Sequence, residues 1–183
     1  ALALAKDGVN IIGVHLDRST TMPDVEKLIS DIKDTGSEAH FFNVNAADPK
    51  NRTNVMDQVE KILSENENST VKVFLHSLAF GTLKPFFADD PADEINQKQI
   101  EMTFDVMANS LVYWSQELVN RKLMVRGGKI YGMTSSGGQR QIEFYGAVSA
   151  AKACMESYIR QLAMELGRLG ISANSIRAGV TET

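Results

Sequence analysis

GKIYGMTSSGGQRQIEFYGAVSAAK, residues 128–152, is the stretch that decides the fold and the hypothesis of function. It begins as a buried strand over 129–133, continues in a polar turn from Thr134, and enters a helix that carries Tyr145 and Lys152. About two helical turns separate these two side chains at roughly 3.6 residues per turn, so they return nearly to the same helix face. We therefore expect the phenol and the ammonium group to meet at one site.

A phenol beside an ammonium group suits reductive chemistry. Phenols are protonated at neutral pH, and a nearby positive charge makes their anion easier to form. Tyr145 can therefore protonate, or hydrogen-bond, an oxygen that gains negative charge when a hydride reaches the substrate. Lys152 can in addition hold a ribose hydroxyl of the hydride donor. The alternative is that Tyr145 only packs and that Lys152 is a solvated surface residue.

Length and composition predict one soluble globular domain over residues 1–183. The chain is 43% apolar and 23% charged, and it is long enough to bury a core without stabilisation by disulfide bonds or metal ions. The net charge of -4, without a basic run, argues against a nucleic-acid binder. The single cysteine, Cys154, excludes an internal disulfide and favours a reducing, cytoplasmic compartment. No apolar run reaches the roughly 18 residues of a membrane span, and the histidines show no metal-ligand spacing, so we expect neither membrane nor metal.

Apolar strands and amphipathic helices alternate along the chain. After a first helix that ends at Gly8, the pattern predicts strands at 10–14, 39–44, 71–75, 129–133 and 171–176, and helices at 20–35, 48–63, 100–119 and 146–166. This alternation predicts an α/β fold, a doubly wound parallel sheet with helices on both faces in three α/β/α layers. The first helix lacks an N-cap and the last residues leave a strand, so we expect a sequence truncated at both ends. Ligands of such folds bind beyond the carboxyl ends of the strands.

The order of these motifs resembles the short-chain dehydrogenase/reductase family, and within it the enoyl-acyl carrier protein reductases. Its most specific part is the spacing of Tyr145 and Lys152, because ordinary members carry their lysine at the position of Ser149. HSLAFG at 76–81, the turn SSGGQRQIEFY and AGVTET at 178–183 are also similar to enoyl reductase segments. The resemblance implies a single Rossmann-type NAD(P)-binding domain that lacks the N-terminal glycine-rich loop and the C-terminal substrate lid.

Three positions depart from the family pattern. Met107 occupies the place of the asparagine that ordinary members use in a proton relay, which fits an enoyl reductase better than a ketone reductase. Ser135 aligns with a second tyrosine of several enoyl reductases, and Val180 replaces a common proline.

The function that the resemblance implies is NAD(P)H-dependent reduction of the carbon-carbon double bond of a trans-2-enoyl thioester in fatty acid biosynthesis. The thioester would be carried by acyl carrier protein or coenzyme A, with Tyr145 stabilising the enolate oxygen and Lys152 holding the cofactor ribose. The alternatives are a short-chain carbonyl reductase acting on 3-oxoacyl groups and a non-catalytic dinucleotide-binding protein. The resemblance also implies a homo-oligomer, a tetramer or dimer, built through the helices at 100–119 and 146–166.

The remaining candidate residues lie at strand ends or rest on the resemblance. Ser135 is the third catalytic candidate, with a purely structural role in the turn as its alternative. At the end of the first strand, Arg18 offers a planar guanidinium to a 2'-phosphate while Asp17 opposes it, and this balance favours NADPH over NADH. The other expected contacts are with the adenine (Asn43 and the backbone of Val44), with the rest of the cofactor (Leu78, Thr181 and Thr183) and with the substrate (Gly81). Their alternatives are a surface asparagine, an ordinary loop glycine and an exposed chain end.

Overall fold

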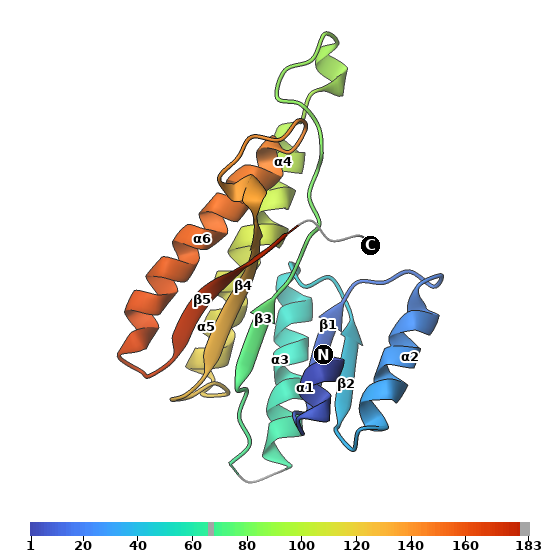
Figure 1. The fold of residues 1–183 in the computed structure, drawn as a ribbon, viewed down its shortest axis with the longest axis vertical. Helices are drawn as coiled ribbons and strands as arrows, with labels where there is room; N and C mark the ends of the chain where they lie inside the picture. The colour runs from blue at the N-terminus through green and yellow to red at the C-terminus, as the bar shows by residue number, and fades with distance from the viewer. Residues whose placement is uncertain (66–67, 180–183) are drawn as a thin grey trace. The chain divides into compact units, whose positions relative to one another are not determined.

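Helices and parallel strands alternate from one end of the chain to the other (Figure 1). The computed structural model describes residues 1–65 and 68–179, and it divides into two units, residues 1–62 and 63–183. Within the described ranges, no helix is long and apolar enough to cross a membrane. The assignment of the chain to a single domain stays a prediction.

The first unit pairs two parallel strands. Its elements are α1 (Leu2–Lys6), β1 (Ile11–His15), α2 (Met22–Lys33), β2 (Ala39–Asn43) and most of α3 (Pro49–Ser64). The helix ends follow the sequence signals: Gly8 and Gly36 adopt the left-handed φ angles of 81° and 88° that terminate α1 and α2. At the start of α3, Oδ1 of Asp48 accepts the N–H of Asn51 at 2.8 Å, so the predicted N-cap is confirmed.

The second unit is built on a parallel sheet with the strand order β3-β4-β5. Because all three strands run the same way, their carboxyl ends meet at one edge of the sheet. The parallel pairing in both units, with helices between the strands, confirms the α/β fold class. The elements of this unit are β3 (Val73–His76), a 3-10 turn (Pro91–Asp93), α4 (Gln97–Phe104), a π-helical turn (Asp105–Asn109), α5 (Ser110–Asn120), β4 (Lys129–Ser135), a second 3-10 turn (Ser136–Gly138), α6 (Gly146–Gly167) and β5 (Ser172–Ala178).

Helix α6 joins the sheet of this unit to its other long helices. It packs on β4 and β5, and it also contacts α4 and α5. Met155 of α6 is fully buried against Gly132 of β4, where an added Cβ would lie 3.1 Å from the Met155 sulfur. Burial of each such apolar side chain stabilises the fold by about 1.5–3 kcal/mol. The buried apolar residues of the unit include Met107, Leu111, Trp114, Leu118, Ile130, Ala151, Ile159 and Leu162. This packing fixes the position of α6 relative to the carboxyl end of β4.

The predicted helix over 100–119 is wrong in two respects. It begins earlier, because Asn96 and Gln99 form a reciprocal capping box in which each side chain accepts the other residue's backbone N–H at 3.0 Å. It is also interrupted by the π-helical turn Asp105–Asn109, a local widening that hydrophobic periodicity does not reveal.

Strand β4 is longer than the sequence indicates. Thr134 and Ser135, predicted as the start of a turn, pair in parallel with Arg177 and Ala178 of β5. The cause is tertiary, because β5 extends far enough to supply partners for two polar residues that would otherwise begin the turn. Ser135 therefore lies at the end of a strand, held in place by the sheet.

Candidate active site

The predicted catalytic residues meet at the 3-10 turn Ser136–Gly138, which directly follows β4. Oγ of Ser135 accepts the N–H of Gly137 at 3.2 Å. The ring of Tyr145 lies against the same glycine, since a Cβ added to Gly137 would be 2.5 Å from Cε1 of Tyr145. A Cβ added to Gly138 would be 3.5 Å from Cβ of Lys152. The two glycines thus let Ser135, Tyr145 and Lys152 approach one turn.

The backbone around Tyr145 departs from the sequence-based expectation. Tyr145 is the N-cap of α6, with φ -96° and ψ 8°, and not a residue within the helix. Phe144 precedes it in the left-handed region at φ 59°, a conformation that is strained for a bulky aromatic residue. This reversal of the chain delays the first helical turn, which closes where the N–H of Ser149 donates to the Tyr145 carbonyl at 2.7 Å. The predicted bounds 146–166 agree with α6, whereas the expectation that the helix itself carries Tyr145 is wrong by one residue. The Tyr145 ring still reaches the turn.

Lys152 is buried, with 5% of its surface exposed. Its Nζ donates to the carbonyl of Met133 at 2.7 Å and to the carbonyl of Leu78 at 3.4 Å. Burial lowers the pKa of the Lys152 ammonium from its ordinary value. The interpretation of Lys152 as a solvated surface residue is wrong, because its charge lies beside the carboxyl ends of β3 and β4.

His76 ends β3 and is 3% exposed. Its Nε2 lies 2.7 Å from Oγ of Ser110, the first residue of α5. Burial, and then the positive charge of Lys152, lower the pKa of His76 to about 4. The imidazole of His76 is therefore neutral at pH 7.

Comparison with known proteins bears on what such a site does. The family model described as "Enoyl-(Acyl carrier protein) reductase" matches residues 1–183. The chain belongs to this family of short-chain dehydrogenase/reductases.

The relatives of this chain carry two different cofactors in their names. The chain is 26% identical over 160 residues to the "Enoyl-[acyl-carrier-protein] reductase [NADPH] FabI" of Staphylococcus aureus, covering 87% of this chain and 58% of that protein. It is 28% identical over 164 residues to the corresponding "[NADH] FabI" of Bacillus cereus, covering 87% and 59%. The chain thus spans less than two thirds of the length of these curated relatives.

A solved structure supports the Rossmann-like fold of the family. The promiscuous reductase LugOII, described as catalysing a keto-reduction, superposes with a TM-score of 0.80 at 20% identity. The superposition covers 99% of this chain and 71% of that one. At this identity the likeness concerns the fold alone.

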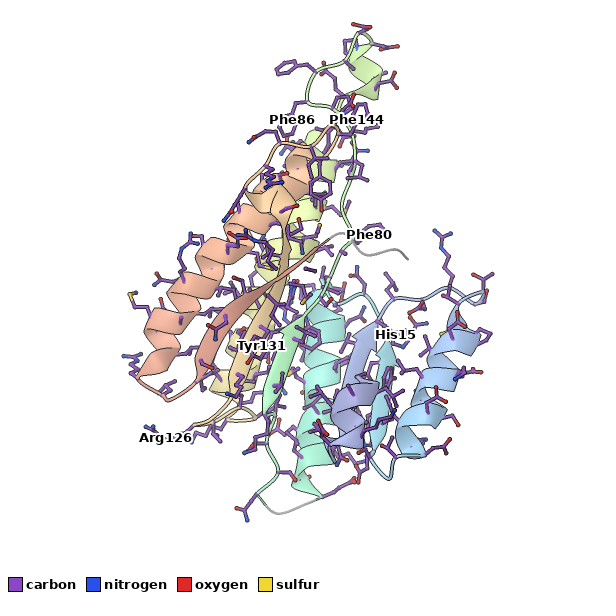
Figure 2. The ribbon with its side chains drawn as sticks, viewed as in Figure 1. His15, Phe80, Phe86, Arg126, Tyr131 and Phe144 are labelled. Carbon is purple, nitrogen blue, oxygen red and sulfur yellow. The ribbon has the colours of Figure 1, made fainter. Side chains whose placement is uncertain are left out.

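Residues at the carboxyl ends of β1 and β2, in the first unit, form a hydrogen-bonded network (His15 is labelled in Figure 2). The Asp17 carboxylate accepts from Thr21 and pairs with Nδ1 of His15, each at 2.8 Å, and these two hydrogen bonds lower its pKa. The Asn43 side chain accepts the N–H of Asp17 at 2.9 Å and donates to the Asp17 carbonyl at 3.0 Å. The N–H of Val44 donates to the backbone carbonyl of His15 at 2.8 Å. Asn43 and Val44 therefore hold the β1 loop, and their contact with an adenine stays a prediction.

The cofactor and substrate contacts expected in the second unit stay predictions, and the structure shows what these residues contact within the protein. The Leu78 carbonyl faces Lys152, whereas Gly81 packs against protein: an added Cβ would lie 2.8–2.9 Å from side-chain atoms of Thr103, Val148 and Met107. The close approach that Gly81 permits is thus to helices of its own unit, not to open space for a substrate. Thr181 and Thr183 lie outside the described residues.

Glu156 is a site residue that the sequence reasoning missed. Its Oε1 accepts the hydroxyl of Thr134 at 2.7 Å and would lie 3.3 Å from a Cβ added to Gly138. Glu156 therefore ties α6 to the end of β4, one helical turn after Lys152. The signal available in the sequence was its i+4 spacing from Lys152, which places both side chains on one helix face.

We predict that Gly137→Ala lowers kcat by about 10–100-fold, because the new methyl group displaces the Tyr145 ring and small misplacements at a reacting centre are costly. Gly138→Ala is the matched control, since its Cβ meets nothing nearer than 3.3 Å. Steady-state kinetics and thermal unfolding of both variants make the measurement. Equal activity of the two variants would mean that the position of the Tyr145 ring does not matter.

Proposed function

We propose that the protein reduces the carbon-carbon double bond of a trans-2-enoyl thioester with a nicotinamide dinucleotide. The observation that carries the proposal is the gathering of Ser135, Tyr145 and Lys152 on the turn after β4. Membership of the enoyl reductase family supports the reaction class. The same proposal places the substrate on acyl carrier protein or coenzyme A in fatty acid biosynthesis, and the protein in a homo-oligomer.

Donors in each unit, taken separately, suit groups of a nicotinamide dinucleotide. Lys152 carries one N–H more than its two carbonyl partners use, and this donor suits a ribose hydroxyl. Arg18, exposed after β1, suits a phosphate. The bound dinucleotide would supply the hydride that adds to the β-carbon of the thioester.

The residues of the turn act on the oxygen end of the substrate. As negative charge develops on the thioester oxygen, the Tyr145 hydroxyl donates a hydrogen bond to it and stabilises the enolate. The buried charge of Lys152 favours electron density on that phenol. The Ser135 hydroxyl still has its proton to donate after accepting from Gly137, so it can bind the same oxygen. Protonation of the α-carbon completes the reduction.

Parallel assays with crotonyl and acetoacetyl thioesters test this proposal. We expect oxidation of the reduced dinucleotide with the crotonyl substrate at a kcat/KM at least tenfold above that with the acetoacetyl substrate. A preference for the acetoacetyl substrate would instead assign the protein as a carbonyl reductase. Tight dinucleotide binding without turnover of either thioester would assign it as a binding protein.

We further propose NADPH as the preferred cofactor. The Asp17 carboxylate, which would repel a 2'-phosphate, is hydrogen-bonded to His15 and Thr21, so part of its charge is compensated locally. The guanidinium of Arg18 is exposed beside it and offers a planar fork of donors.

Arg18→Ala is expected to raise the Kd for NADPH about tenfold, because the variant loses one hydrogen bond to a charged group. The Kd for NADH should change less than twofold, because NADH has no phosphate at that ribose. Fluorescence titration of both dinucleotides gives the comparison. An equal loss of affinity for NADPH and NADH would show that Arg18 does not bind the 2'-phosphate.

A further inference from the structure

Nδ1 of His76 is a buried acceptor that the chemistry above does not use. The atom is shielded from solvent and has no hydrogen-bond partner among the described residues. A buried polar atom without a partner costs about 1–3 kcal/mol, so proteins rarely leave one unsatisfied.

The bonds of Ser110 determine which nitrogen of His76 carries the proton. The Ser110 hydroxyl has one proton, and its Oγ donates to the carbonyl of Val106 at 2.8 Å. The contact of Oγ with Nε2 of His76 at 2.7 Å is then a hydrogen bond only if Nε2 carries the proton and donates it. Nδ1 is left with a lone pair that requires a donor.

Burial, and then the positive charge of Lys152, lower the pKa of His76. The two recorded bonds of the ammonium are unequal: 2.7 Å to Met133 and 3.4 Å to Leu78. A charged N–H donor prefers about 2.7–2.9 Å, so the hydrogen bond to the Leu78 carbonyl is long and weak. Leu78 follows His76 by two residues on the same segment, so the weakly bonded N–H of Lys152 and the acceptor Nδ1 of His76 belong to neighbouring positions of the chain.

We propose that a buried water joins Lys152 to His76, and that His76 is a positioning residue for the ammonium group. The water accepts an N–H of Lys152 and donates one proton to Nδ1 of His76 and the other to the Leu78 carbonyl. Three hydrogen bonds of this kind are typical of a buried water. The third N–H of Lys152 remains for the ribose hydroxyl. The arrangement fixes the position of the Lys152 ammonium group, and the effect of that position on activity rests on the proposed function.

Two substitutions at His76 distinguish the roles of its two ring nitrogens in the intact protein. His76→Asn places an amide oxygen near the position of Nδ1 and loses the bond to Ser110. His76→Gln reaches Ser110 and loses the acceptor at Nδ1. We expect kcat within twofold of wild type for the asparagine variant, and about tenfold lower for the glutamine variant with an unchanged KM for the dinucleotide. A glutamine variant as active as wild type, or an asparagine variant impaired as much as the glutamine variant, would overturn the proposal.

A measurement on the wild-type protein does not depend on activity. Nitrogen NMR chemical shifts of the imidazole distinguish a nitrogen that carries a proton from one with a lone pair. We expect the proton on Nε2 and a hydrogen-bonded lone pair on Nδ1. A proton on Nδ1 would overturn the water bridge even if enoyl reduction holds. Absence of turnover with the expected tautomer would instead overturn the proposed function alone.

Discussion

Tyr145→Phe is expected to lower kcat for the crotonyl thioester by roughly 10²–10⁴-fold, the usual contribution of a positioned proton donor. Phenylalanine keeps the ring that lies against Gly137, so the turn and the start of α6 should be undisturbed. Only the hydroxyl that would stabilise the enolate oxygen is lost. Affinity for the dinucleotide, measured by fluorescence, should stay within twofold of wild type.

Tyr131→Phe is the matched control for this variant. Tyr131 is a half-buried residue in the middle of β4 (Figure 2) and is given no role in the reaction. Its hydroxyl can be removed without change to kcat. If Tyr145→Phe retains wild-type kcat, Tyr145 is not the residue that stabilises the substrate oxygen.

Acid is expected to destabilise the protein through His76. The pKa of His76 is about 4 in the folded chain and 6.5 in the unfolded chain. Between these pH values His76 binds a proton in the unfolded state but stays neutral in the folded state. The free energy of unfolding therefore falls as the pH is lowered from 6.5 to about 4. The stabilisation is fully present above pH 6.5, and its loss amounts to about 3 kcal/mol once the pH is below 4. Urea unfolding at a series of pH values measures this slope.

The variant His76→Gln should flatten that slope, because glutamine does not titrate. His40→Gln, which removes an imidazole that lies on β2 with a third of its side chain exposed, controls for the loss of a histidine as such. A slope that persists in His76→Gln would assign the acid sensitivity to another group.

The α/β alternation and the approach of Tyr145 and Lys152 to one turn could be predicted because both depend on short spacings. Amphipathic periodicity locates α2, α3 and α6, and the spacing of Tyr145 and Lys152 brings both side chains to one turn even though Tyr145 lies outside α6. Asp48 was likewise recognisable as a cap, since its partner Asn51 is three residues away.

Features that depend on partners distant in the sequence could not be predicted. His76 and Ser110 are 34 residues apart, and no local pattern indicates that they meet. Thr134 and Ser135 are strand residues because of β5, which follows some forty residues later. The left-handed Phe144 is strained, and sequence reasoning assigns such a conformation to glycine or asparagine first.

The apolar surface beside Tyr145 was also outside the reach of sequence patterns. Phe86 lies against Gly146, where an added Cβ would be 2.6 Å from Cζ of the ring, and Phe144 lies at the same end of the unit (Figure 2). Phe86 and Phe144 are each about half exposed. The segment that carries Phe86 has no helical or strand periodicity, so only the structure brings it to the start of α6.

The central claim is that a hydride adds to the β-carbon of an enoyl thioester. The most direct measurement uses NADPH deuterated at the transferring position of the nicotinamide C4, crotonyl thioester and mass spectrometry of the product. We expect a butyryl thioester with one deuterium on the β-carbon. Deuterium on the α-carbon, or no butyryl product while acetoacetyl thioester is consumed, would contradict it.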